Sequence, residues 1–260
     1  MTEPGIGEDA VRRMVATVSR DGEPDLVAVE EPLEIRVDGR PLAVTMRTPA
    51  HDEELALGFL YGEGLIDSPR EAGLSEDLAA NTIDVAGPLL RDPSTRNFYA
   101  TSSCGVCGKG ALEEVATLAP HVGAAGPIVD RALLETLPEG MHQPTFELTG
   151  GLHATGLFDT EGALLLVRED VGRHNAMDKV VGRALLDGML PFRDRLLCVS
   201  GRLSFELVQK AAMAGAPVVV GVGAPSSLAI ELAGDRGITL AGFARRGSVN
   251  IYTGADRVRG

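Results

Sequence analysis

Residues 195–243 read RLLCVSGRLSFELVQKAAMAGAPVVVGVGAPSSLAIELAGDRGITLAGF and alternate short apolar runs with longer amphipathic segments. The apolar runs at 195–200, 217–223 and 237–243 predict buried strands. The two segments between them have apolar residues at helical spacing, and Ser204 is suited to cap the first helix. A strand–helix–strand–helix–strand order predicts a mostly parallel sheet covered by helices, so the fold class is α/β.

Two strands and a helix are predicted just before this run. LHATGLF (152–158) and ALLLVRED (163–170) read as strands that are joined by a turn at 159–162. NAMDKVVGRALLDGML (175–190) has the apolar spacing of a helix, with Asn175 as its N-cap.

The N-terminal half has a different pattern. Two β-rich runs flank Asp38 and Gly39, a dipeptide that favours a two-residue hairpin. DEELALGFLYGEGLI (52–66) predicts a short helix with acidic residues in its first turn, and 81–85 predicts a weak strand.

These patterns divide the chain into four parts. Residues 1–24 are polar and read as a loose leader, and 25–98 form a small β-rich (α+β) domain. Residues 99–126 are a linker that contains a mobile C-x-x-C loop and a helix. Residues 127–260 form the larger α/β domain, which carries the strands and helices described above.

Composition restricts the class of protein. The chain has 260 residues, 44% of them hydrophobic, which excludes intrinsic disorder. With 24 Lys and Arg against 37 Asp and Glu, the net charge of −13 argues against non-specific binding to nucleic acid or to an anionic membrane. We find neither the apolar stretch of a signal peptide nor one long enough to span a bilayer, so the sequence predicts a cytoplasmic protein without membrane partners.

The sharpest chemical signal is the C-x-x-C formed by Cys104 and Cys107 in SSCGVCGKG. A nearby cation and a helix N-terminus both favour the thiolate, and Lys109 and a helix predicted from about residue 110 supply them. Redox or sulfur-handling chemistry is the favoured interpretation. A mixed zinc site with His153 or His174 is an alternative, whereas a thioredoxin motif fits less well because no core strand precedes the pair.

Histidines and charged residues gather at the end of the 163–170 strand. His153 follows Gly-Gly at the start of the 152–158 strand. Taken alone, a histidine in that position is more often a hydrogen-bonded structural residue than a ligand-binding one. REDVGRHNAMDK is a charged cluster between a strand and a helix, which would ordinarily be a solvated face; we interpret it as a ligand site, because open α/β sheets bind ligands at this position. Its charged or titratable members are Arg168, Glu169, Asp170, Arg173, His174, Asp178 and Lys179.

Three loops follow the predicted strands of the 195–243 run. Small residues and hydroxyls before a helix suit phosphate, because free N–H groups and the helix dipole point at it, and arginines add charge-assisted contacts. Together the loops suggest a nucleotide-bearing or multi-phosphate ligand, although neither a P-loop nor a G-x-G-x-x-G fingerprint is present. The residues concerned are Ser200, Gly201, Arg202, Ser204, Gly221, Gly223, Ser226, Ser227, Arg245 and Arg246.

In order and spacing, eight motifs resemble the FdhD family of formate dehydrogenase accessory sulfurtransferases, over about residues 27–256. They are EEPLEIRVDG, DEELALGFLYGEGLI, SSCGVCGKG, TGGLHATGLF, REDVGRHNAMDKVVG, SGRLSFELVQKAAMAGAPVVV, APSSLAIELA and GITLAGFARRGSVNIYT. The resemblance implies a cytidine-deaminase-like sheet, mixed or parallel and flanked by helices, preceded by the small β-rich domain.

The same resemblance implies a function. A cysteine desulfurase would load persulfide sulfur onto Cys104 and Cys107, the expected catalytic residues. The sulfur would pass to the molybdenum cofactor, in its bis(molybdopterin guanine dinucleotide) form, for the catalytic subunit of formate dehydrogenase. A homodimer, and GDP as a surrogate ligand, are also implied. We expect the cofactor to be bound by Phe243, Ala244, Arg245, Arg246, Gly247, Ser248, Arg202, Ser226, Ser227, His153 and His174, and no metal site in the protein itself.

Functions of other classes are alternatives to a sulfur carrier. Deamination is excluded, because a zinc deaminase needs H-x-E before its P-C-x-x-C, and the place of that Glu is taken here by Thr155, with the C-x-x-C upstream. A chaperone that escorts the molybdenum cofactor without transferring sulfur would need the phosphate loops but not the cysteines. A zinc-binding interaction module would instead contain stoichiometric metal.

Overall fold

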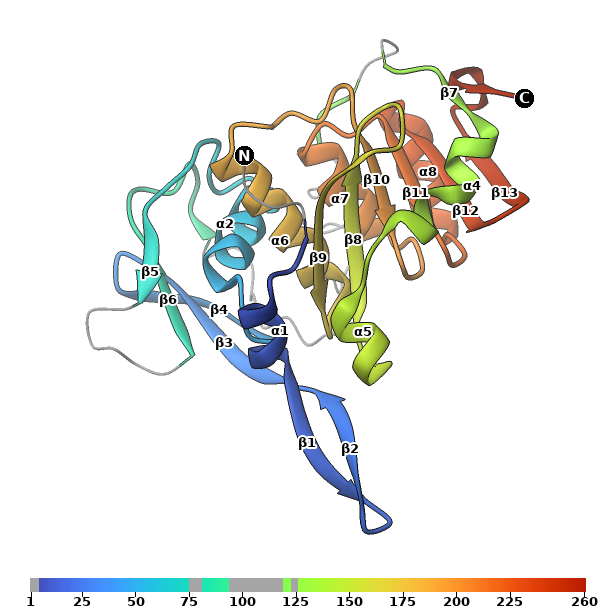
Figure 1. Cartoon of the computed structure of the whole chain (residues 1–260). Coiled ribbons are helices and arrows are strands. Elements are labelled where there is room, and N and C mark those ends of the chain that lie inside the picture. Colours follow the sequence, from blue (N-terminus) through green and yellow to red (C-terminus); the bar gives the residue numbers. More distant parts are fainter. Residues whose placement is uncertain (1–4, 75–80, 94–118, 123–125) are drawn as a thin grey trace.

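A computed structural model describes residues 5–74, 81–93, 119–122 and 126–260. Its centre is a six-stranded sheet in the order β13-β12-β11-β10-β8-β9 (Figure 1). Neighbouring strands are parallel from β10 to β12, whereas β8, β9 and β13 run antiparallel to their neighbours. The strands are β8 (His153–Phe158), β9 (Leu164–Asp170), β10 (Leu196–Val199), β11 (Val218–Gly221), β12 (Thr239–Arg245) and β13 (Ser248–Thr253).

The α/β class is confirmed, and the parallel part is the strand–helix run that the sequence predicts. The sheet as a whole is mixed rather than mostly parallel. Strand β13 was not predicted; it pairs with β12 through a turn that contains Gly247, whose φ is 77°.

Helices cover both faces of the sheet because its strands are apolar on both sides. Leu197 and Val199 of β10 contribute to the core beneath α6, α7 and α8, whereas Leu196 and Cys198 face α4 on the opposite side (Figure 1). The helices and short strands of this unit are α4 (Arg131–Gly140), α5 (Pro144–Thr149), α6 (Arg173–Leu186), α7 (Phe205–Met213), α8 (Ser227–Arg236), η2 (Ala255–Arg257), β7 (Val129–Asp130) and β14 (Val258–Arg259).

A second, four-stranded sheet in the order β4-β3-β6-β5 forms the N-terminal β-rich unit. Asp38 and Gly39 join β3 and β4 with positive φ values of 47° and 73°, as the predicted two-residue hairpin requires. Helix α2 packs its apolar face on this sheet. The elements are β3 (Glu31–Val37), β4 (Arg40–Arg47), α2 (Asp52–Gly62), β5 (Ala72–Leu74) and β6 (Thr82–Val85).

Helices α2 and α6 cross at two glycines. A Cβ atom added to Gly58 would lie 1.8 Å from the carbonyl oxygen of Asp178, and one added to Gly182 would lie 1.8 Å from that of Glu54. The two backbones therefore touch directly, and this contact places α6 relative to the N-terminal unit.

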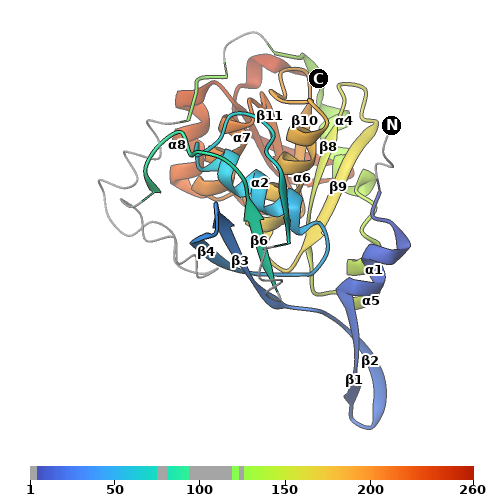
Figure 2. The ribbon, with the colours of Figure 1, turned by 90° about the vertical axis from the view of Figure 1, so that its left-hand side faces the viewer.

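The prediction of a loose leader is wrong for residues 8–24. They fold into α1 (Glu8–Met14), β1 (Val15–Arg20) and the start of β2 (Glu23–Ala28), and the β1–β2 hairpin projects from the body (Figures 1 and 2). Asp21 and Gly22 have positive φ values of 54° and 89°, which suits a tight hairpin turn. The fully buried Met14 fixes the base of this arm, where its Sδ lies 3.7 Å from Thr145 Oγ1.

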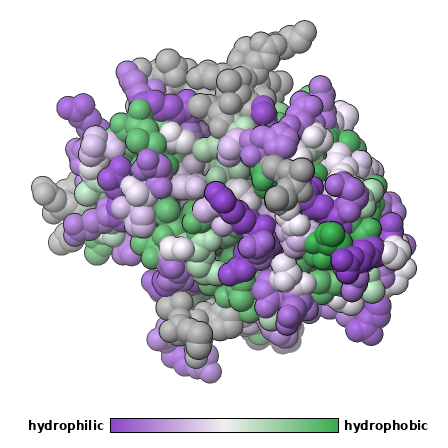
Figure 3. All heavy atoms as spheres, turned by 90° about the horizontal axis from the view of Figure 1, so that it is seen from above, coloured by the Kyte–Doolittle hydropathy of each residue, from purple (hydrophilic) through white to green (hydrophobic). Residues whose placement is uncertain are grey.

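None of the described helices is long and apolar enough to cross a membrane. In the view of Figure 3, hydrophilic residues are interspersed with smaller hydrophobic patches.

Candidate functional site

The carboxyl ends of β10, β11 and β12 lie at one edge of the sheet, here called the carboxyl edge. The start of β8 also lies there, because β8 runs antiparallel to β10 and Ser200 N–H donates to Ala154 O at 2.9 Å. Gly223 N–H donates to Gly201 O at 2.9 Å, and Phe243 N–H to Gly223 O at 3.2 Å. The structure thus brings the predicted loops together side by side, in agreement with the strand order.

Two serine-capped helix N-termini face this edge. Ser204 Oγ accepts a hydrogen bond from Leu207 N–H at the start of α7, and Ser226 Oγ accepts one from Ala229 N–H at the start of α8. The predicted cap at Ser204 is confirmed. The loops approach each other so closely that a Cβ atom on Gly223 would lie 3.0 Å from Arg202 Cα.

His174 lies on the first turn of α6 and contacts the first turn of α7. Its Nε2 is 3.1 Å from Ser204 Oγ and 3.1 Å from Glu206 Oε2. His153 packs beside Gly201, where an added Cβ atom would lie 3.3 Å from its Nδ1. Burial lowers the pKa of His153, and the charges of Arg173, His174 and Arg202 lower it further, so a neutral imidazole is favoured there.

Arginines supply positive charge at the carboxyl edge. Within the described ranges, Arg173, Arg202 and Arg245 form no ion pair with a carboxylate. Arg246 differs, because it pairs with Glu139 of α4 at 2.7 Å in an exposed position. The two predicted phosphate-binding arginines of the β12–β13 turn therefore have different surroundings, and only Arg246 has a carboxylate neighbour.

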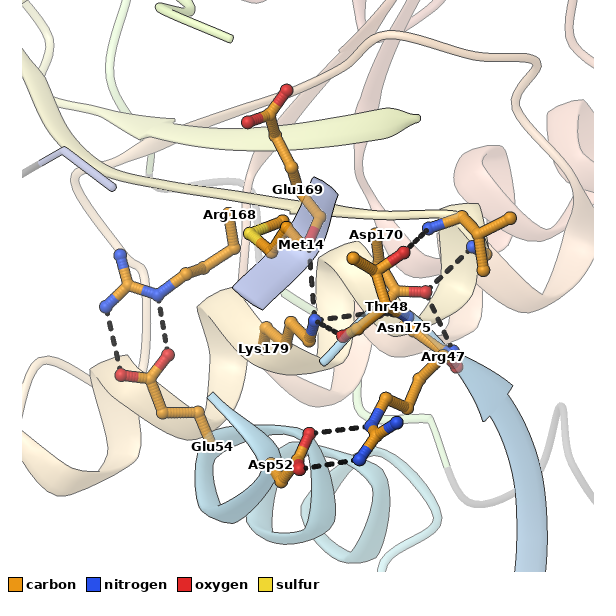
Figure 4. A network of polar contacts seen from close by, with 12 residues as sticks. Met14, Arg47, Thr48, Asp52, Glu54, Arg168, Glu169, Asp170, Asn175 and Lys179 are labelled. Carbon is orange, nitrogen blue, oxygen red and sulfur yellow. Dashed lines mark hydrogen bonds and ion pairs between the residues drawn. The ribbon is translucent and has the colours of Figure 1, made fainter. Parts of the chain in front are cut away.

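Much of the charged cluster REDVGRHNAMDK is buried and structural. Arg168 donates to Glu54 of α2 at 2.6 and 2.9 Å (Figure 4). Lys179 lies 2.7 Å from Asp170 in a pair whose side chains are fully buried. Neither a solvated face nor a ligand site describes Arg168, Asp170 and Lys179, the three cluster residues in these pairs. They join β9 and α6 to the N-terminal unit, because Arg168 contacts Glu54 and the other two also hydrogen-bond to the backbone of Thr48.

The remaining acids of the cluster also have structural partners. Glu169 accepts the backbone N–H groups of Thr145 and Phe146, at 3.0 and 2.8 Å, and so holds the start of α5. Burial raises the pKa of Glu169, while these hydrogen bonds oppose that shift. Asp178 accepts from Lys210 at 2.8 and 3.0 Å. Of the cluster, His174 and Arg173 remain near the carboxyl edge.

The predicted N-cap at Asn175 is wrong. Helix α6 begins at Arg173, with Gly172 in the cap position. The Asn175 amide instead donates to Met46 O at 2.7 Å and to Asp170 at 3.0 Å, because β4 of the N-terminal unit packs against this turn. The sequence of the turn alone does not reveal that long-range partner.

Cys104, Cys107, Lys109 and the helix expected from about residue 110 lie outside the described residues. Their predicted roles, and the alternative of a mixed zinc site that includes them, stay predictions. Cys198, in contrast, is fully buried in β10, and burial raises the pKa of its thiol. It has the surroundings of a small apolar core residue rather than of a nucleophile.

Glu206 is a site residue that sequence reasoning missed. It stands two positions after the predicted N-cap Ser204, a placement that suggests a helix-capping role and nothing more. Its contact with His174 spans 32 positions of sequence and depends on how α6 and α7 pack, so the sequence offers no local signal for it.

Comparison with known proteins identifies the family of this chain. The model of the FdhD/NarQ family matches residues 28–259. The chain belongs to the FdhD/NarQ family. The resemblance seen in the eight motifs is thereby confirmed, from β2 to the C-terminal strand β14.

Relatives of this family align along almost the whole chain. A protein of Streptomyces coelicolor named sulfur carrier protein FdhD is 49% identical, over 97% of each chain. One of the same name from Mycolicibacterium paratuberculosis is 52% identical, over 90% of this chain and 92% of its own. A crystal structure of a putative formate dehydrogenase accessory protein from Desulfotalea psychrophila is 28% identical, with a TM-score of 0.72, and covers 94% of this chain and 97% of its own.

Proposed function

We propose that this FdhD/NarQ protein is a sulfur carrier for the maturation of formate dehydrogenase. The observation that carries the proposal is its similarity, at about half of all positions and nearly full length, to proteins named as sulfur carriers. The similar solved structure, described as a putative formate dehydrogenase accessory protein, supports the choice of formate dehydrogenase as the client. The pair Cys104 and Cys107 supplies the thiols that such chemistry needs.

In the loading step, a Cys104 or Cys107 thiolate attacks the terminal sulfur of a persulfide on a cysteine desulfurase. A new S–S bond forms on the carrier, the S–S bond of the donor breaks, and the donor cysteine leaves as a thiolate. The exchange needs no external oxidant, and its rate depends on the fraction of attacking thiolate. Cys198 takes no part, because it is buried in the sheet.

The acceptor in this proposal is the molybdenum cofactor, bound as a substrate in its bis(molybdopterin guanine dinucleotide) form. The carboxyl edge suits such a ligand: the N-terminus of α8, which has no acidic residue in its first turn, suits phosphate, and the side chains of Arg173, Arg202 and Arg245 are unpaired within the described residues. His153, His174, Ser226, Ser227 and residues 243–248 complete the proposed binding set. The strand order β9-β8-β10-β11-β12 also supports a deaminase-like origin of the sheet.

We expect the β12–β13 turn to bind guanine nucleotide. Replacing both Arg245 and Arg246 by alanine should weaken GDP binding at least tenfold, because each charge-assisted contact to a phosphate contributes about 1.5–3 kcal/mol. Isothermal titration calorimetry with GDP measures the loss. We expect Arg245 to account for more of the loss, because Arg246 must first leave Glu139.

A charge-matched control is available for this experiment. Arg20 of β1 and Arg40 of β4 are exposed arginines of the hairpin arm and the N-terminal sheet. The double variant Arg20→Ala/Arg40→Ala lowers the net charge equally and should retain the GDP affinity of the parent. Equal GDP affinities of the two double variants would show that the nucleotide does not bind at this turn.

The proposed partners are a cysteine desulfurase, the catalytic subunit of formate dehydrogenase and a second copy of this chain. The competing function is a chaperone that binds the same cofactor without carrying sulfur. Activation of formate dehydrogenase by the purified protein, with and without desulfurase and cysteine, tests the proposal. A sulfur carrier depends on the desulfurase, whereas a chaperone activates equally well without it.

A further inference from the structure

The contact between His174 and Glu206 joins two helices at the carboxyl edge. Glu206 Oε2 lies 3.1 Å from His174 Nε2, and both side chains are about a quarter exposed, at 28% and 26%. Ser204 Oγ is also 3.1 Å from Nε2 and 3.5 Å from Glu206 Oε2. Two polar groups, a hydroxyl and a carboxylate, therefore converge on a single ring nitrogen.

The chemistry of the imidazole, the carboxylate and the hydroxyl determines which ring nitrogen of His174 carries the proton. A carboxylate only accepts hydrogen bonds, so its oxygen can remain at 3.1 Å from Nε2 only if Nε2 carries the proton. The Ser204 hydroxyl already accepts from Leu207 N–H and can direct its own proton toward Glu206. The arrangement thus selects the tautomer with the hydrogen on Nε2.

The charges around Glu206 keep it ionised. Its hydrogen bond with His174 lowers the pKa of Glu206, and the charges of Arg173 and Lys210 lower it further, against the opposing effect of burial. Lys210 is itself held between Asp178, at 2.8 Å, and Glu63, at 3.9 Å.

The other ring nitrogen of His174 is left for a ligand. Within the parts of the chain that the structure describes, Nδ1 of His174 makes no hydrogen bond. A neutral imidazole with its proton fixed on Nε2 presents Nδ1 as an acceptor, and the protonated ring presents it as a donor. His174 belongs to a group of interacting charged or titratable residues, since the charges of His174, Arg173, Arg202 and Asp170 all act on His153.

We propose that Glu206 is a positioning residue: it fixes His174 with Nε2–H on its carboxylate, so that Nδ1 exchanges a proton with the substrate during sulfur transfer. The inference rests on the proposed function, because it assigns His174 to the transfer step. The alternative is a purely structural role, in which Glu206 only stabilises the start of α7, as an acid in the first turn of a helix does.

Nitrogen-15 NMR of the histidine rings tests the contact without any activity measurement. The chain has five histidines, so the signals of His174 are assigned by their loss in His174→Gln. The parent protein should show a protonated Nε2. Glu206→Gln can donate its amide N–H to Nε2 and should move the proton to Nδ1, whereas Glu206→Asp keeps an acceptor and should largely restore the parent pattern.

Function is measured on the same variants. Glu206→Gln should still melt cooperatively and accept sulfur from the desulfurase, yet activate formate dehydrogenase at least about tenfold less than the parent, because a misplaced proton removes general acid–base assistance. Glu206→Asp should recover part of that loss. The matched control is Glu231→Gln, which removes an exposed carboxylate of α8 and should behave as the parent.

Either of two results would overturn the proposal: an unchanged His174 tautomer in Glu206→Gln, or a changed tautomer with full activation of formate dehydrogenase. A parent protein that accepts no sulfur from the desulfurase would instead refute the proposed function. The NMR measurement would still decide the contact between Glu206 and His174 in that case.

Discussion

Alanine at Cys104 or at Cys107 is expected to reduce activation of formate dehydrogenase by at least about 100-fold, because each substitution removes a thiol of the sulfur-carrying pair. The measurement is the formate dehydrogenase activity obtained after maturation with each variant. GDP affinity should remain that of the parent, because we propose the nucleotide site on the β12–β13 turn and the neighbouring loops.

Cys198→Ala is the matched control for these variants. It removes the same sulfur atom from a fully buried position on β10, so it should cost about 1 kcal/mol of stability and leave activation intact. Full activation by the double variant Cys104→Ala/Cys107→Ala would defeat the sulfur carrier and favour the cofactor chaperone.

Gly58→Ala and Gly182→Ala should each destabilise the fold by more than about 3 kcal/mol. The reason is geometric: in each variant the new methyl group would lie 1.8 Å from a backbone carbonyl oxygen of the facing helix. Helices α2 and α6 must then separate, which disturbs the buried contact of Arg168 with Glu54 and the placement of His174. Urea unfolding followed by circular dichroism measures the change.

A glycine of α8 provides the comparison. Gly234 lies within a helix on an exposed face, and its nearest neighbour to an added Cβ is Thr253 Cγ2 at an ordinary 3.7 Å. Gly234→Ala should therefore stabilise the protein by about 0.5–1 kcal/mol, through the higher helix propensity of alanine. Equal unfolding midpoints for Gly58→Ala and Gly234→Ala would contradict the close crossing of α2 and α6.

Periodicity explains which parts of the fold the sequence predicts. The strands and helices of 195–243 are found as expected because each strand is apolar throughout and each helix presents one apolar face. The Asp38–Gly39 turn is found because its positive φ values restrict it to a few residue types. Such signals are local and need no knowledge of the rest of the chain.

The missed features depend on distant partners. The β1–β2 hairpin is largely exposed on its outer half, so its sequence lacks the alternation that predicts a half-buried strand. The sequence predicts that Arg168 binds a ligand. In the structure it instead pairs with Glu54, which is 114 positions away in the chain. The strand order is enough to predict that His174 and Arg202 lie at the carboxyl edge. The contact of Glu206 with His174 could not be predicted in this way, because it depends on how α6 packs on α7.

The central claim is that the C-x-x-C carries sulfur, and intact-mass spectrometry tests it most directly. The purified protein is incubated with a cysteine desulfurase and cysteine, then measured before and after treatment with a thiol reductant. The proposal predicts a mass increase of one or more sulfur atoms on the parent and on Cys198→Ala, which the reductant reverses, and none on Cys104→Ala/Cys107→Ala. No added sulfur on the parent, or the same addition on the variant that lacks both cysteines, would contradict it.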